Sequence, residues 1–123
     1  MADEEHLLHR QVNPGWVQHG EFSSQTFKPT PKDDNKLSIY DGKQMDAADS
    51  FAHYTTVQKL NSVGVVSVST AEVEAVALRW EIDGVPFPQH GYVDFAALSG
   101  NQAKAKAAQL KAKALARGWS YQP

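Results

Sequence analysis

Cysteine is absent from the 123 residues, which excludes disulfide bonds, thiolate catalysis, zinc–thiolate sites and iron–sulfur clusters. Long apolar runs are missing as well, since no stretch approaches the roughly 18 residues that a membrane-spanning helix needs. The sequence opens MADEEHLLHR, which is acidic where a secretory signal peptide is basic and then apolar. We therefore expect a cytoplasmic protein without a membrane partner, stabilised by burial and hydrogen bonding.

Signature motifs of common enzymes are also missing. Neither the phosphate-binding pattern G-x-x-x-x-G-K-[ST] nor the dinucleotide pattern G-x-G-x-x-G occurs. None of the candidate nucleophiles Ser23, Ser24, Ser67 and Ser69 stands in a G-x-S-x-G context. The five histidines are dispersed along the sequence without a carboxylate framework, so we expect no bound metal and no cofactor.

The composition is that of an ordinary folded domain. Hydrophobic residues make up 41% and charged residues 21%, and this length allows one core, so we expect a single domain over residues 1–123. The net charge of -2 argues against nucleic acid as a partner. All five charged residues after position 100 are basic, and we interpret this cationic stretch as a solvated helix face.

Periodicity and turn residues predict an α+β fold, with a small mixed β-sheet and about three helices packed against it. Residues 1–5 are expected to be frayed, and the longest loop is expected at residues 28–36. The predicted strands are 6–12, 22–27, 37–40, 63–68 and 90–95. The predicted helices are 47–60, 70–80 and 101–117. Because segment 63–68 is mostly valine, we expect it to be the central strand of the sheet.

Capping residues mark where the helices begin and end. Asp46 stands at an N-cap position, and Ser69 with Glu72 has the spacing of a capping box. Gly118 follows the last helix as a C-terminal stop. In that helix a stripe of small and apolar residues should pack on the sheet, and two aromatic residues beyond Gly118 should fold back over the core. The stripe is Ala103, Ala107, Leu110 and Ala114, and the aromatic residues are Trp119 and Tyr121.

One candidate binding site combines Arg10 with Ser23 and Ser24. A guanidinium beside two hydroxyls can bind a phosphate or a carboxylate. The alternative is structural: Arg10 pairs with an acidic residue of the chain, and the serines end a strand. The residue types do not separate these two hypotheses.

A second candidate site lies on the predicted strand 90–95. Strand alternation places His90, Tyr92 and Asp94 on one face. A histidine held by a neighbouring aspartate is suited to acid–base catalysis, but the same pair also satisfies a half-buried imidazole. Both interpretations stay open at this point.

Four short patterns together carry a resemblance to a known group of proteins. They are His9-Arg10-x-x-x-Pro14, Gly20-x-x-Ser23-Ser24-x-x-Phe27-x-Pro29, Leu37-Ser38-Ile39-Tyr40 and Pro88-x-His90-x-x-x-Asp94-Phe95. The pattern covers most of the chain and resembles a family of small uncharacterised bacterial proteins, which implies a bacterial origin but no activity to transfer. A more distant analogy, to ADP-ribosyltransferase folds, assigns Arg10, Ser24, and Glu72 or Glu74 to an NAD site, although the capping box already explains Glu72.

From the sequence we interpret the protein as a non-enzymatic binding or accessory module with another protein as its partner. It fits the small partner of a bacterial toxin, immunity or defence system. The alternative is a small enzyme or nucleotide-binding domain that uses Arg10, Ser23, Ser24, His90 and Asp94. A cavity in which Arg10 and His90 converge would favour the alternative. The oligomeric state is not predicted.

Overall fold

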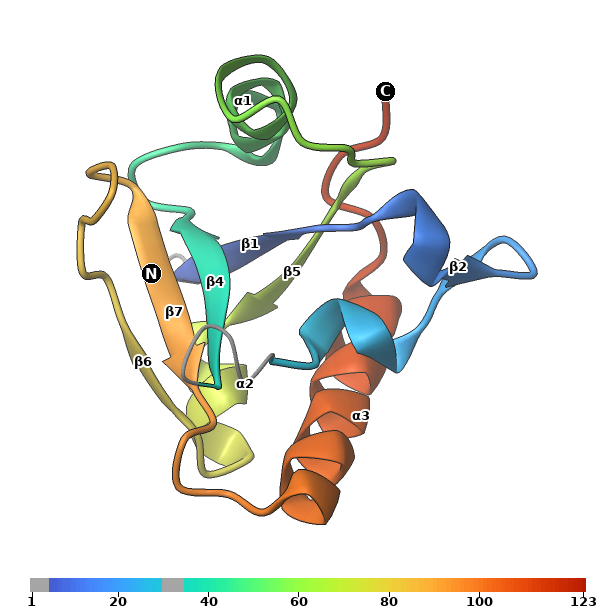
Figure 1. Ribbon diagram of the computed structural model, residues 1–123, viewed down its shortest axis with the longest axis vertical. Coiled ribbons are helices and arrows are strands. Elements are labelled where there is room, and N and C mark those ends of the chain that lie inside the picture. Colours follow the sequence, from blue (N-terminus) through green and yellow to red (C-terminus); the bar gives the residue numbers. More distant parts are fainter. Residues whose placement is uncertain (1–4, 30–34) are drawn as a thin grey trace.

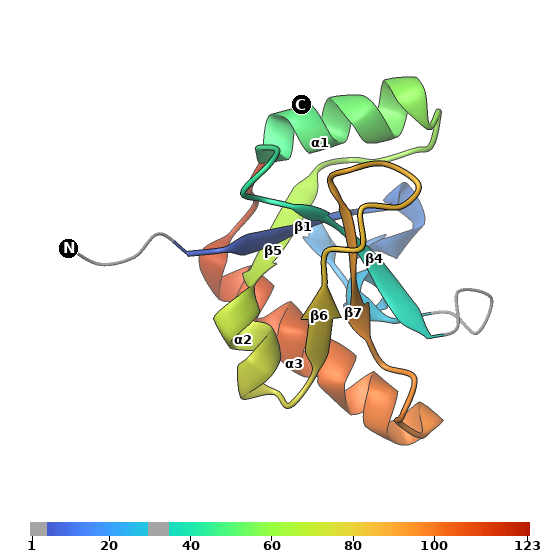
Figure 2. The same cartoon turned by 90° about the vertical axis from the view of Figure 1, so that its left-hand side faces the viewer.

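The structure is a computed structural model that describes residues 5–29 and 35–123. Residues 1–4 of the predicted frayed start and residues 30–34 of the predicted loop lie outside the described residues. The described chain forms an antiparallel sheet with helices on both faces, so the predicted α+β class is confirmed (Figures 1 and 2).

The main sheet has five strands in the order β5-β1-β4-β7-β6, and every pairing is antiparallel. A separate two-stranded hairpin pairs β2 with β3. The strands are β1 (Leu7–Gln11), β2 (Val17–Gln18), β3 (Glu21–Phe22), β4 (Lys36–Asp41), β5 (Val65–Ser69), β6 (Arg79–Glu81) and β7 (His90–Asp94). Strands predicted at 6–12, 37–40 and 90–95 are confirmed as β1, β4 and β7.

The helices lie in two layers, one on each side of the sheet (Figure 2). Helix α1 (Ala47–Ala52) continues as a π-helical turn (His53–Val57) on one side, and α3 (Gly100–Arg117) lies on the other, with the short α2 (Thr70–Ala75) next to it. Asp46 caps α1 by accepting a hydrogen bond from the Asp49 amide, as predicted. Two 3₁₀ segments, Pro14–Trp16 and Ser24–Phe27, complete the described elements.

Helix α3 packs on the sheet through the predicted stripe. Ala107, Leu110 and Ala114 are buried, and Ala103 packs against the core, as alanine and leucine at helical spacing require. Ser99 and Gln102 form a capping box at its start, and Gly118 ends it with a φ of 86°. Leu110 is fully buried in the core between α3 and the sheet.

Strand β5 is at the edge of the sheet and not at its centre, which corrects the prediction for segment 63–68. Its five residues are all buried, because α1 and α3 pack on its two faces. At the start of this free edge the chain after α3 pairs with Val65, whose amide donates to the Tyr121 carbonyl at 2.8 Å and whose carbonyl accepts from the Ser120 amide at 2.8 Å. Burial of both faces therefore did not imply a strand neighbour on both sides.

Two further boundaries differ from the predictions. The helix predicted at 70–80 ends at Ala75, because Ala77 adopts a left-handed φ of 62° and Arg79–Glu81 pairs with β7 as β6. The capping box of Ser69 and Glu72 at its start is confirmed. The strand predicted at 22–27 is present only at Phe22, after which the chain turns into the 3₁₀ segment Ser24–Phe27.

The two faces of the sheet differ in chemistry, and this difference positions the site. On β4 and β7, Leu37, Ile39 and Val93 point into the core that α3 covers. Alternation turns Ser38, Tyr40, His90 and Tyr92 to the opposite face. The sheet therefore presents an apolar face to α3 and a polar, aromatic face to the side of α1.

Candidate functional site

A cavity of 660 Å³ opens on the polar face of the sheet. Its walls come from β1, β4, the chain that follows α1, and the connection from β6 into β7. Arg10 and His90 both line it, together with Lys36 and Ser38. The volume lies within the range of small-ligand sites, and a cavity shared by Arg10 and His90 is the arrangement that favours the ligand-binding or enzymatic alternative.

His90 is held between a carboxylate and a hydroxyl. Its Nδ1 lies 2.7 Å from Asp83 Oδ1, and its Nε2 lies 3.2 Å from Ser38 Oγ. An ionised carboxylate only accepts hydrogen bonds, so the imidazole proton belongs on Nδ1, and Nε2 accepts from the Ser38 hydroxyl. The three side chains thus form a continuous hydrogen-bonded chain at the cavity wall.

The turn between β6 and β7 brings Asp83 to His90. Gly84 adopts a left-handed φ of 67°, and its amide donates to the His90 carbonyl at 3.0 Å. Glycine reaches this conformation without steric cost, so the chain reverses directly after Asp83. His90 is the first residue of β7 and lies opposite Tyr40 in the sheet. Ser38 is two residues from Tyr40 along β4, so its side chain is on the same face, diagonal to His90.

Two permanent cations line the same cavity. The Arg10 Nε donates to the Thr26 carbonyl at 2.8 Å, Nη1 donates to the Ser38 carbonyl at 2.9 Å, and the guanidinium lies 5.3 Å from the Trp16 ring. The Lys36 ammonium lies 4.8 Å from the centre of the Tyr92 ring. Among the described lining residues the acid is Asp83, and its carboxylate contacts His90.

Aromatic rings form another wall of the cavity. Tyr40 and Phe87 stack with ring centres 5.2 Å apart, and His53 packs against the Tyr40 ring. Burial raises the pKa of Tyr40 to about 12, although a hydrogen bond from Gln58 opposes this effect, and the Tyr40 hydroxyl lies 2.8 Å from His53 Nδ1. His53 begins the π-helical turn, a distortion that often occurs at functional sites.

The structure brings together only part of the residue set proposed from sequence. Arg10 and His90 share the cavity, whereas Ser23, Ser24 and Asp94 are not among its lining residues. The expected pairing of His90 with Asp94 is wrong, because four residues of strand span roughly 13 Å and the Asp94 carboxylate accepts from the Ala96 amide. Asp83, in the turn before β7, contacts His90 in place of Asp94.

Ser38, Asp83 and Lys36 are the site residues that sequence analysis missed. Ser38 had one signal, the alternation of 37–40, which separates it from Leu37 and Ile39 on the opposite face. The only signal at Asp83 is the Asp-Gly pair that it forms with Gly84, which is typical of a turn. The G-x-S-x-G motif describes a nucleophilic serine at a glycine-rich turn, and a serine in mid-strand does not match it.

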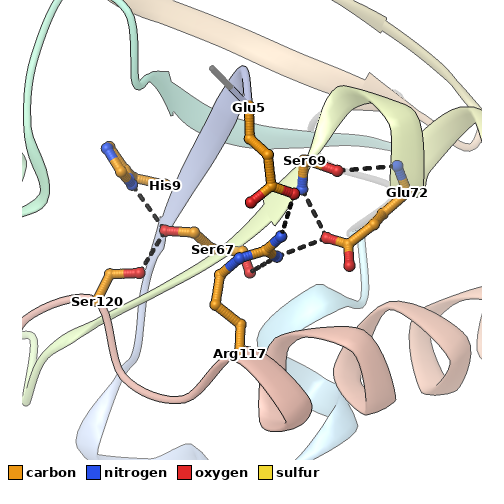
Figure 3. Close-up of polar contacts among 7 residues, drawn as sticks. All are labelled: Glu5, His9, Ser67, Ser69, Glu72, Arg117 and Ser120. Carbon is orange, nitrogen blue, oxygen red and sulfur yellow. Dashed lines mark hydrogen bonds and ion pairs between the residues drawn. The ribbon is translucent and has the colours of Figure 1, made fainter. Parts of the chain in front are cut away.

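A second polar cluster, the closed cluster, lies at the β5 side of the sheet and is mostly buried (Figure 3). The His9 Nδ1 lies 2.7 Å from Ser67 Oγ, which lies 2.7 Å from Ser120 Oγ. His9 is 4% exposed and Ser67 is fully buried. Burial lowers the pKa of His9, although the Met45 backbone and the charges of Asp46 and Asp41 oppose this effect.

Arg117 joins this closed cluster to the end of α3 (Figure 3). Its Nη1 donates to the Ser67 carbonyl at 3.2 Å and to Glu72, and its Nη2 donates to Glu5 at 2.7 Å. Burial raises the pKa of Glu72, but the bonds from Arg117 and from the Ser69 amide outweigh burial and lower it overall. Glu72 is therefore engaged in capping α2 and in an ion pair with α3.

No three histidine, aspartate or glutamate side chains in residues 5–29 and 35–123 are grouped so that they could hold a metal ion. None of the helices in the described part of the chain combines the length and apolar character needed to cross a membrane. Comparisons with models of known protein families, with curated proteins and with solved structures found no match. The resemblance to small bacterial proteins therefore stays a prediction.

Proposed function

We propose that the cavity on the polar face of the sheet binds a small organic anion that carries a flat ring. The observation that supports this proposal most is the combination of Arg10 and Lys36 with stacked aromatic side chains in one 660 Å³ cavity. Cations select a phosphate or carboxylate, and aromatic walls select a planar group. A nucleotide has both features, as does an aromatic acid.

Matched pairs of probes test whether charge and ring are both needed. We expect 2-naphthoate and AMP to shift the amide resonances of Lys36, His90 and Tyr92, and we expect 2-naphthamide and adenosine to bind at least about tenfold more weakly, as the loss of one charge-assisted hydrogen bond predicts. Equal affinity for the neutral and anionic members of each pair would contradict the proposal, as would shifts confined to residues outside the cavity.

A pair of lysine variants locates the anion. Lys36→Met should weaken binding of the anionic probe by about tenfold, because one cation leaves the cavity. Lys104→Met removes the same charge from the exposed surface of α3 and should leave the affinity unchanged. If both variants weaken binding equally, the effect is one of overall charge and the cavity is not the site.

Binding of another protein is a second candidate function, favoured by apolar side chains near the cavity. Val57 is 67% exposed and Val85 is 64% exposed, and each is followed directly by a cavity residue, Gln58 or Pro86. Leu60, 46% exposed, lines the cavity itself. Large apolar side chains exposed at or beside the residues of one cavity are typical of interaction surfaces. A double variant, Val57→Ser with Val85→Ser, should then release a protein partner while the affinity for 2-naphthoate stays unchanged.

A further inference from the structure

Three side chains in the cavity have the mutual geometry of a nucleophile, its base and the residue that orients the base. Ser38 Oγ lies 3.2 Å from His90 Nε2, within reach for proton transfer. Asp83 Oδ1 lies 2.7 Å from His90 Nδ1, on the opposite edge of the imidazole. The residues come from β4, β7 and the turn before β7, so only the folded sheet assembles them.

The surroundings of Ser38 differ from those of a serine with a structural role. Ser38 is exposed and lines a cavity, so a substrate carbonyl can reach its hydroxyl. The guanidinium of Arg10 donates to the main-chain carbonyl of Ser38 at 2.9 Å, so a permanent cation is bound to the backbone of the same residue. Positive charge held next to a reacting carbonyl stabilises the oxyanion that forms on attack.

We propose that the protein is a serine esterase in which Ser38 is the nucleophile, His90 the general base and Asp83 a positioning residue. Its substrates are carboxylic esters with an anionic, ring-bearing part. This substrate class rests on the proposed function, whereas the reactivity of Ser38 rests only on the geometry of the three residues.

The reaction needs water as its only co-reactant. Ser38 Oγ bonds to the ester carbonyl carbon while His90 Nε2 takes the hydroxyl proton. The bond from that carbon to the alcohol oxygen then breaks, and His90 returns the proton to the leaving alkoxide. Water attacks the acyl-enzyme, gives a proton to His90, and the carboxylic acid leaves as Ser38 Oγ recovers that proton. No group is oxidised or reduced.

A covalent probe tests the nucleophile without any knowledge of the substrate. We expect diisopropyl fluorophosphate to add one phosphoryl group per chain, and peptide mapping by mass spectrometry to place the group on Ser38. Ser38→Ala should abolish the adduct, and His90→Gln should slow its formation by at least about a thousandfold, as in other enzymes that use a serine–histidine pair. Ser23→Ala serves as the matched control and should label at the wild-type rate. A wild-type chain without an adduct, or with one on another residue, would overturn the proposal.

The role of Asp83 is tested by whether a second carboxylate restores the rate of labelling. Asp83→Asn should slow labelling by at least about tenfold, because an amide can also donate and so no longer fixes the imidazole proton on Nδ1. Asp83→Glu retains the carboxylate and should recover part of the rate, which a residue needed only for the turn would not do. Equal rates in the wild type and Asp83→Asn would remove Asp83 from the proposal.

The affinity of Ser38→Ala for 2-naphthoate separates this inference from the proposed function. If the cavity binds the anion and Ser38 does not react, the esterase proposal fails alone. If Ser38 reacts with the probe but no anion binds, the esterase remains and its substrate class is wrong. With 4-nitrophenyl acetate, we expect hydrolysis that disappears in Ser38→Ala.

Discussion

Two histidine–serine pairs lie on the same side of the sheet, and their surroundings give them different chemistry. In the closed pair, His9 and Ser67 are buried, and Ser120 continues the hydrogen-bonded chain at 2.7 Å. In the open pair, His90 contacts Ser38 at 3.2 Å beside a cavity, and Asp83 holds the far side of the imidazole. A carboxylate partner and access for a ligand distinguish the two, although the residue types are the same.

The comparison shows that a histidine beside a serine is not by itself a catalytic pair. Burial of His9 disfavours its charged form and lowers its pKa, so this imidazole is a weak base. His90 instead has the Asp83 carboxylate 2.7 Å from its Nδ1, on the edge of the imidazole away from Ser38. The closed pair is therefore suited to holding β1, β5 and the chain after α3 together.

The largest loss of stability is expected when Arg117, the cation of the closed cluster, is replaced. Arg117→Met should lower the free energy of unfolding by about 3 kcal/mol, because Glu72 and the Ser67 carbonyl both lose a charged donor in a mostly buried setting. Urea denaturation measures this change. The control is Lys111→Met, which removes an ion pair to the exposed Glu21 and should cost less than about 1 kcal/mol. Equal losses in both variants would contradict a special role of the closed cluster.

The next largest loss of stability is expected when Ser67, the serine of the closed pair, is replaced. Ser67→Ala removes the hydroxyl between His9 and Ser120, and leaves the buried His9 Nδ1 without its partner. An unsatisfied buried polar group costs about 1–2 kcal/mol, which the midpoint of urea denaturation should report. A variant as stable as the wild type would show that the hydrogen bond between His9 and Ser67 adds nothing to stability.

A smaller effect is expected in the pH dependence of stability. Because the folded chain lowers the pKa of His9 below its ordinary 6.5, the unfolded chain binds a proton there that the folded chain does not. The contribution of neutral His9 to stability is fully present above pH 6.5 and is lost as the pH falls below it. His9→Gln should therefore flatten the decline in unfolding free energy between about pH 7 and pH 5. An unchanged slope would show that His9 titrates alike in both states.

The smallest effect on stability is expected for the open pair. Ser38→Ala should change the free energy of unfolding by no more than about 0.5 kcal/mol, because the side chain is exposed and His90 keeps its bond to Asp83. Thermal unfolding of this variant beside Ser67→Ala gives the comparison directly. A loss as large as that of Ser67→Ala would mean that Ser38 is a structural residue.

The sequence predicted the elements whose pattern is local. Alternation of Leu37 and Ile39 identified β4, and the alanine stripe with Gly118 identified α3, because these signals depend on neighbours along the chain. The position of β5 was not predictable from its valines. Its two faces are covered by α1 and α3 and its edge by the chain around Tyr121, and these contacts depend on segments far away in the sequence.

The site was predictable only in part for the same reason. The sequence identifies Arg10 and His90 as charged or titratable residues on expected strands, and they share the cavity. The sequence does not identify Ser38 and Asp83, because their positions depend on the pairing of β4 with β7 and on the turn at Gly84. Alternation gives the face on which a side chain lies, whereas the strand order decides which side chains meet on that face.

The pairing of Tyr121 with Val65 has a consequence for biosynthesis. A ribosome releases β5 well before the segment around Tyr121, so the outer edge of this valine-rich strand has no partner while the rest of the chain is being made. An unpaired edge of this composition can pair with a strand of another nascent chain. The residues around Tyr121 therefore protect the start of the β5 edge, at Val65, only once they have been synthesised.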